Sequence, residues 1–220
     1  MKNKLLTVLF AIAVMIFILT FSIGLPIYCR FFYYLHIRPL GLEEISGQSY
    51  ATIKQAYDQV LNYLTIPGCE FGTGVFTYTE AGKAHFEDCK ALFDLNAVAL
   101  LLSTITLTTL LILNKRKIIT LEKVGGFSAS FYASILLLVL FLIIGVLVAL
   151  DFDTAFKVFH QIFFPGKDNW LFGKNDQIIY VLPSRFFLNC GILIISSIIA
   201  FTGSLITIGI CKKVKSKKVQ

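Results

Sequence analysis

The chain has 220 residues, of which 56% are hydrophobic, and its mean hydropathy is +0.77. Several apolar runs approach the ~20 residues that a helix needs to cross a bilayer, which excludes a soluble globular domain and predicts an all-α integral membrane protein. The net charge of +7 requires no nucleic-acid partner, because over half of the basic residues flank the apolar runs, as expected for a membrane protein.

Four membrane-spanning helices are predicted, over residues 5–26, 95–113, 131–150 and 186–211. Two lysines precede the first of them, as in a secretory signal. Its apolar stretch is long, however, and no small-x-small cleavage site follows, so we expect a retained helix. The interiors of the spans offer Ser, Thr and Gly rather than charged residues, which disfavours a transporter or channel.

Basic residues predict the orientation of these helices. Segments 1–4, 114–130 and 212–220 contain eleven of the 20 basic residues and one of the 13 acidic residues. Short loops rich in Lys and Arg stay in the cytoplasm, so both termini are expected there, in a multi-pass protein of the cell membrane. The two remaining segments, 27–94 and 151–185, then lie outside, where they are expected to form a small extracytoplasmic cap.

The first outer segment, 27–94, opens with an aromatic cluster at 30–36 that suits the membrane interface. Between residues 43 and 64, apolar side chains recur at helical spacing, which predicts an amphipathic helix ended by a Pro-Gly pair at 67–68. The glycine-rich stretch 71–78 is too short for a helix and predicts an extended piece.

The end of this segment contains the first candidate catalytic residue. The run Thr77-Tyr-Thr-Glu has the form of a capping box, so a helix is predicted to start near Thr77 and to continue through His85 into the second span. On that helix His85, Asp88 and Cys89 share a face. A carboxylate from Glu87 or Asp88 would fix the tautomer of His85. The alternative is a solvated histidine on an exposed turn.

The second outer segment, 151–185, contains the second candidate, His160. Residues 151–164 predict a short interfacial helix with Asp153 as its cap. Five phenylalanines surround the histidine in sequence, and partial desolvation favours the neutral imidazole that can act as a base. The alternative is an aromatic anchor whose histidine merely binds water or a carbonyl. Beyond this helix, Trp170 suits headgroup depth, and Arg185 either binds an acidic or carbonyl group or extends to the interface.

Five cysteines give no regular disulfide framework and no paired CxxC metal site. We expect buried thiols, with a disulfide between Cys69 and Cys89 as the alternative. Two histidines without HxxxH or HExxH spacing make a weak ligand set, so we expect neither a metal nor another cofactor.

Three groups of residues in this order carry a resemblance. They are Thr79-Glu-Ala-Gly-Lys-Ala-His-Phe-Glu-Asp-Cys-Lys, then Phe156-Lys-Val-Phe-His-Gln-Ile-Phe-Phe with Trp170 after it, and then Asp176-Gln-Ile-Ile with Leu182-Pro-Ser-Arg-Phe-Phe. Together with the four spans and two outer segments, they resemble the lipoprotein intramolecular transacylase (Lit) family of low-GC Gram-positive bacteria. Residues 40–74 match only loosely.

The resemblance implies an acyltransferase that moves the sn-2 acyl chain of a diacylglyceryl lipoprotein onto the α-amine of its N-terminal cysteine, leaving a lyso form. The nucleophile is the substrate's own amine, with a reference pKa of about 7.7 to 8.0, so no enzyme nucleophile is needed. We expect His85 as general base and His160 as acid or oxyanion donor, or the reverse.

Other residues are expected to support this reaction. Glu87 or Asp88 would orient His85, and four more side chains are candidates for holding the glyceryl or peptide part of the substrate: Tyr78, Trp170, Asp176 and Arg185. The lipoprotein and membrane lipid are the expected partners of a monomer. The rival hypothesis is a non-catalytic four-span membrane adaptor or regulatory subunit, which would be indifferent to loss of the histidines.

Overall fold

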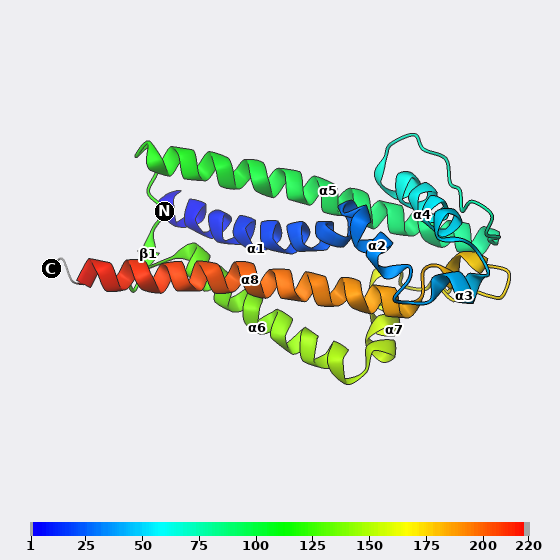
Figure 1. Cartoon of the computed structure of the whole chain (residues 1–220). Helices are drawn as coiled ribbons and strands as arrows, with labels where there is room; N and C mark the ends of the chain where they lie inside the picture. Colours follow the sequence, from blue (N-terminus) through cyan, green and yellow to red (C-terminus); the bar gives the residue numbers. More distant parts are fainter. Residues whose placement is uncertain (1, 218–220) are drawn as a thin grey trace. The chain divides into compact units, whose positions relative to one another are not determined.

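The computed structural model describes residues 2–217 (Figure 1). Met1 and residues 218–220, including Lys218, lie outside the described residues, so the predicted terminal segments 1–4 and 212–220 are described only in part. The chain is mainly helical. Its elements are α1 (Lys2–Tyr28), α2 (Arg30–His36), α3 (Leu42–Ser46), α4 (Tyr50–Thr65), α5 (Glu80–Lys115), β1 (Lys123–Val124), β2 (Phe127–Ser128), α6 (Ala129–Leu150), α7 (Phe152–Phe163), the 3₁₀ helix η1 (Gln177–Tyr180) and α8 (Ser184–Lys217).

Within the described residues, four helices are long and apolar enough to cross a membrane: α1, α5, α6 and α8. This confirms the predicted fold class, an all-α membrane protein with four spanning helices. At 1.5 Å per residue, α5 is about 54 Å long, well beyond the ~30 Å hydrocarbon core. Its first turns, from Glu80 to Asp94, carry six charged residues. Because charges are costly in hydrocarbon, we place the membrane-spanning part of α5 after Asp94.

The chain divides into two compact units, and each long helix contributes to both. The first unit comprises residues 1–23, 97–146 and 193–220, and the second comprises residues 24–96 and 147–192. Every predicted site residue belongs to the second unit.

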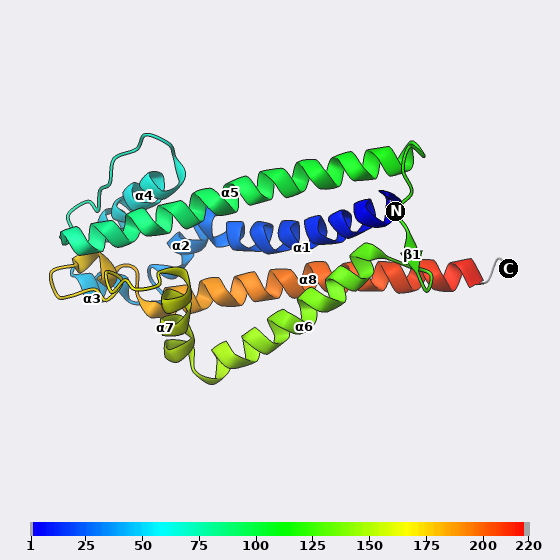
Figure 2. The same cartoon turned by 180° about the vertical axis from the view of Figure 1, so that it is seen from behind.

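In the first unit, α1, α5 and α8 run side by side (Figures 1 and 2). Buried apolar side chains from these helices, from α6 and from the loop after α5 form one core: Phe10, Val14, Ile18, Leu110, Ile119, Ala133, Leu137 and Ile198. Ser22 Oγ donates a hydrogen bond to Ser197 Oγ at 3.1 Å, which joins α1 to α8.

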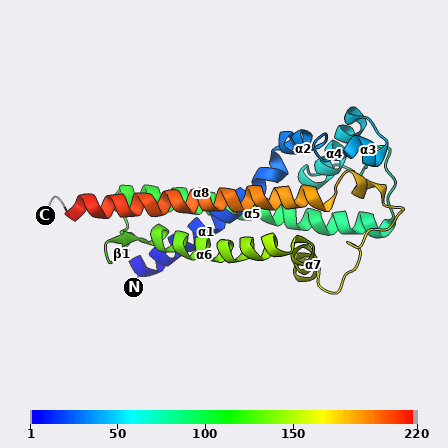
Figure 3. The ribbon, with the colours of Figure 1, turned by 60° about the horizontal axis from the view of Figure 1, so that its bottom comes forward.

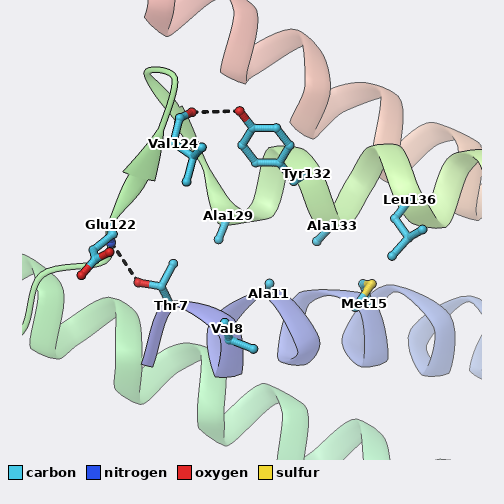
Figure 4. A pocket seen from close by; sticks show the side chains of 10 residues that line it. All are labelled: Thr7, Val8, Ala11, Met15, Glu122, Val124, Ala129, Tyr132, Ala133 and Leu136. Carbon is cyan, nitrogen blue, oxygen red and sulfur yellow. Dashed lines mark hydrogen bonds between the residues drawn. The ribbon is translucent and has the colours of Figure 1, made fainter. Parts of the chain in front are cut away.

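A two-stranded hairpin precedes α6 in the first unit (Figure 3). Strands β1 and β2 pair antiparallel, and the connecting residues Gly125 and Gly126 both have positive φ, as tight hairpin turns of this length require. A pocket of about 280 Å³ lies between α1, the hairpin and α6, where Ala11, Ala129 and Ala133 leave space (Figure 4). It contains none of the predicted site residues.

In the second unit, Tyr33 of α2 is fully buried and lies at the centre of the packing. Its ring stacks on Tyr57 of α4 with centroids 3.7 Å apart, and its hydroxyl donates to the carbonyl of Val181 at 2.6 Å. A polar tie also joins these helices, because Asp58 accepts hydrogen bonds from Arg30 and Tyr34.

The amphipathic helix expected over 43–64 is broken in two. Gly47 has φ +67, in the left-handed region, and ends α3. Ser49 then caps α4, because its side chain accepts from the amide of Thr52. The apolar stripe of α4 is buried as the spacing predicted, and residues 66–79 form an irregular connection to α5.

Candidate functional site

The two candidate histidines lie side by side in the second unit. His85 comes from the first turns of α5 and His160 from α7, and their ring centroids are 5.6 Å apart with an interplanar angle of 34°. Only 5% of His85 and 6% of His160 is exposed. Burial overturns the alternative of a solvated His85. The alternative for His160, an aromatic anchor whose histidine binds water or a carbonyl, is not excluded by burial, because its Nδ1 lies against the Phe156 carbonyl.

Aromatic side chains enclose the pair. Phe164 and Phe172 place their ring centroids 5.0 and 5.5 Å from that of His85. Phe156 lies 4.4 Å from His160, and the Trp170 indole stacks on the same imidazole at 4.8 Å and 30°. This shell removes water from both rings.

Burial sets the protonation state of the pair. Desolvation, together with the neighbouring His160 and Lys167, lowers the pKa of His85 to about 4, while Asp88 acts in the opposite direction. Burial also lowers the pKa of His160, against a smaller opposing effect of the Phe156 carbonyl. Both imidazoles are therefore neutral near pH 7.

The hydrogen bond of His160 fixes its tautomer. Nδ1 lies 2.7 Å from the carbonyl oxygen of Phe156, one turn earlier on α7. A carbonyl oxygen only accepts, so Nδ1 carries the proton and Nε2 of the neutral ring carries the lone pair. His160 thus has a base at Nε2.

His85 has a different set of neighbours. Its Nε2 lies 3.4 Å from Sγ of Cys89, whose pKa burial raises to about 12, so the sulfur remains a thiol. Its Nδ1 is buried and has no hydrogen-bond partner among the described residues. The thiol therefore contacts one ring nitrogen, while the other has no partner among the described residues.

A pair of neutral imidazoles in a shell that excludes water can accept and donate protons. Similarity to known proteins identifies the reaction family. The model of the family "Lipoprotein intramolecular transacylase Lit" matches residues 8–187. The chain belongs to this family. It is therefore an acyltransferase, which excludes the non-catalytic adaptor considered from the sequence.

Solved structures of the membrane-integral transacylase Lit from Bacillus cereus share the fold of this transacylase. One matches with a TM-score of 0.85 and 21% identity, covering 100% of this chain and 99% of the other. Two further structures of that protein have one histidine replaced, by arginine or by alanine. Both match with a TM-score of 0.78, at 19% and 20% identity, covering 100% of this chain and 95% and 96% of theirs. No curated protein sequence matches significantly.

Asp88 in the transacylase does not hydrogen-bond His85, contrary to the expected orienting role. Its two oxygens accept from Lys167 Nζ at 2.5 Å and from Asn169 Nδ2 at 2.9 Å. Burial raises the pKa of Asp88, but these hydrogen bonds and the charges of Lys167 and His85 together lower it by more, so the carboxylate stays charged. Glu87 is exposed and forms no hydrogen bond with the described residues. The carboxylate instead ties α5 to the segment between α7 and η1.

Asp176 of the transacylase is a helix cap rather than a free binding group. Its Oδ1 accepts from the amide and hydroxyl of Thr79, at 2.7 and 2.8 Å, and it is only 3% exposed. Thr79 in turn accepts from the amide of Gly82, so α5 begins at Glu80, later than the predicted start near Thr77. A Cβ at Gly82 would collide with the Asp176 carboxylate, so only glycine fits there.

The remaining predicted residues fall into two groups. Trp170 joins the site through its stack on His160. Tyr78 packs its ring edge against Phe71 at 4.9 Å and is 40% exposed, while Arg185 is exposed and forms no hydrogen bond or ion pair with the described residues. The cap of α7 is Asp151, which accepts from the amide of Thr154, and not the predicted Asp153.

Within residues 2–217, no group of three or more His, Cys, Asp or Glu side chains is arranged to hold a metal ion. All five cysteines are free, so Cys69 and Cys89 are not joined. The sequence did not single out Phe172, Lys167 or Asn169. Each reaches α5 from roughly 80 residues away in the chain, and no local pattern signals such a contact.

Proposed function

We propose that the chain moves the sn-2 acyl chain of a diacylglyceryl lipoprotein to the α-amine of its N-terminal cysteine, with the two histidines as the proton-transfer groups. The observation that carries the proposal is the juxtaposition of two buried, neutral imidazoles, 5.6 Å apart, within an aromatic shell. In each imidazole, one ring nitrogen faces a group of the protein and the other does not.

The proposed reaction needs no covalent participation by the protein. The amine nitrogen attacks the ester carbonyl carbon and forms the new C–N bond, and a histidine takes one of its protons. The C–O bond to the glyceryl group then breaks, and the departing oxygen receives a proton. Ester and amine thus become alcohol and amide with no net gain or loss of protons. Because both groups belong to one molecule, holding them together lowers the barrier substantially.

The hydrogen bonds favour one division of roles. His160 is the base, through Nε2, because its Nδ1 proton is committed to the Phe156 carbonyl. His85 is the oxyanion donor: an S–H bond from Cys89 to Nε2 leaves the proton on Nδ1, where it stabilises the tetrahedral oxyanion by a hydrogen bond. The proton that His160 took from the amine then passes to the departing glyceryl oxygen, so both imidazoles end neutral. This is the second of the two divisions of roles that the sequence left open.

The charge pattern that predicts the orientation of the spans supports an extracytoplasmic site and cytoplasmic termini. We further propose that the chain acts as a monomer surrounded by membrane lipid. Trp170 covers the His160 base. Arg185 and Tyr78, exposed in the same unit, are proposed to contact the glyceryl or peptide part of the substrate.

Expression in cells that make a diacylglyceryl lipoprotein with a free amine tests the function. Mass spectrometry of the isolated lipoprotein is expected to show one O-linked and one N-linked acyl chain. An unchanged diacylglyceryl form, despite correct insertion of the enzyme, contradicts the proposal.

A further inference from the structure

Asn169 has a polar atom that the reaction described so far does not use. Its Nδ2 donates to Oδ2 of Asp88 at 2.9 Å, and a carboxylate only accepts hydrogen bonds, so the amide cannot be turned the other way round. Its carbonyl oxygen Oδ1 is thereby held as an acceptor. This oxygen is buried, and no group among the described residues donates to it.

Unpaired buried acceptors are uncommon, because a polar atom removed from water without a hydrogen bond costs stability. Within residues 2–217, the buried side-chain atoms in this condition are Oδ1 of Asn169, Nδ1 of His85 and Oγ of Ser134. Two of these three belong to the second unit, and one of the two is on a histidine of the proposed catalytic pair.

Contacts place Asn169 in the same cluster as both histidines. Its partner Asp88 follows His85 by three residues on α5, which puts the two side chains on one helix face. The next residue, Trp170, stacks on His160. Lys167, which bonds the other oxygen of Asp88, is close enough to His85 for its charge to lower the pKa of that histidine.

The substrate of the proposed function supplies the missing donor. A neutral primary amine has one lone pair and two N–H bonds. When the lone pair points at the ester carbonyl, one N–H faces the base and the second needs an acceptor. We propose that Oδ1 of Asn169 accepts this second N–H, so that Asn169 is a positioning residue for the substrate's α-amine, held in orientation by Asp88. This inference rests on the proposed function.

Two single variants distinguish an Asn169 that positions the substrate's amine from an Asn169 that only holds Asp88 in place. Asn169→Ala removes the acceptor and one bond to Asp88, whereas the matched control Lys167→Met removes the other bond and keeps the acceptor. With a synthetic dipalmitoylglyceryl-cysteine peptide in mixed micelles, kcat/KM is expected to fall roughly tenfold in Asn169→Ala, as for the loss of one hydrogen bond, and less than threefold in Lys167→Met. Equal losses in both variants overturn the inference.

A double variant provides a measurement that would stay the same if Asn169 only held Asp88 in place. Asp88→Asn combined with Asn169→Asp keeps an amide-to-carboxylate bond between the two positions but puts the negative charge beside the amine. That charge raises the pKa of the amine, so the pH–rate profile is expected to move to higher pH. Restored activity with an unmoved profile contradicts the inference. Failure of the wild-type chain to convert the peptide would instead defeat the proposed function.

Discussion

The two units of the chain differ in the contacts that stabilise each of them internally. In the first, the helices pack through a continuous apolar core, with the Ser22–Ser197 bond between α1 and α8. In the second, carboxylates join segments far apart in the chain: Asp58, Asp88 and Asp176 each accept hydrogen bonds from another element. Apolar burial is non-directional and does not fix the position of an individual atom, whereas a hydrogen bond constrains both a distance and an angle. The unit that carries the proposed chemistry is the one built on directional contacts.

The largest effect is expected from removing the base. His160→Asn should lower kcat by roughly 10² to 10⁴, the usual contribution of a general base. His36 is a matched control, because its Nδ1 also lies against the carbonyl one turn earlier, at 2.6 Å from Phe32 O, yet it lies outside the pair. Turnover of the lipoprotein peptide is measured for His160→Asn and for His36→Asn, after membrane insertion of both variants has been confirmed. Equal activity in the two variants would exclude His160 as the base.

The pH–rate profile separates the histidines from the amine. The amine, with a reference pKa of about 7.7 to 8.0, protonates first, so the rate should fall about tenfold per pH unit between pH 7 and 6. Because burial lowers the pKa of both histidines, no second fall is expected at pH 6.5. The rate should fall more steeply than tenfold per pH unit only at lower pH, as the pH approaches the lowered pKa values of the histidines. A second break at pH 6.5 would show that at least one imidazole is hydrated.

The same lowered values affect stability. As the pH falls below 6.5, the unfolded chain binds protons that folded His85, with its pKa of about 4, does not. The free energy of unfolding should therefore decrease between pH 6.5 and 4.

The Asp176 cap can be broken by one carbon atom. In Gly82→Ala, the new Cβ collides with the Asp176 carboxylate, and the loss of its bonds to Thr79 should lower the free energy of unfolding by about 1 to 3 kcal/mol. Gly191→Ala in α8 meets nothing within 4 Å and should be neutral or slightly stabilising. Denaturant unfolding in detergent measures both. Equal stability of the two variants would mean that the cap contributes little.

A smaller effect is expected at Cys89. Cys89→Ala removes the contact to Nε2 of His85 and should lower kcat roughly threefold to tenfold, the value of one hydrogen bond, because the tautomer is no longer held. Cys89→Ser keeps a donor and should retain most of the activity. If serine is as poor as alanine, the sulfur matters through packing alone.

The first unit should show the smallest effect and only on stability. Ser22→Ala removes the bond to Ser197 at a cost of about 1 kcal/mol, with turnover unchanged. A double-mutant cycle with Ser197→Ala isolates the pair. A loss of activity in Ser22→Ala would show that the two units do not differ as described.

The sequence predicted the features that depend on apolar burial, but not the hydrogen bonds between segments far apart in the chain. The apolar runs and their lengths predicted the fold class, because burial in lipid depends on composition. The spacing around His85 put Asp88 and Cys89 on its face, but could not tell which one it contacts. Asp88 is occupied by Lys167 and Asn169, from 79 and 81 positions away, and Asp176 replaces the predicted capping box from 97 positions away. Such partners become visible only when the chain is folded.

The cap on α5 also sets an order of events during synthesis. Thr79 leaves the ribosome 97 residues before Asp176, a delay of roughly 5 to 20 seconds at ordinary elongation rates. For that time the Thr79 amide before α5 has no carboxylate to receive it. His85 gains the α7 histidine and the Phe164 ring earlier, when residues 160–164 have been made. A chain cut short before residue 160 lacks one of the two histidines, whereas one cut between residues 164 and 176 contains both but lacks the carboxylate that receives Thr79.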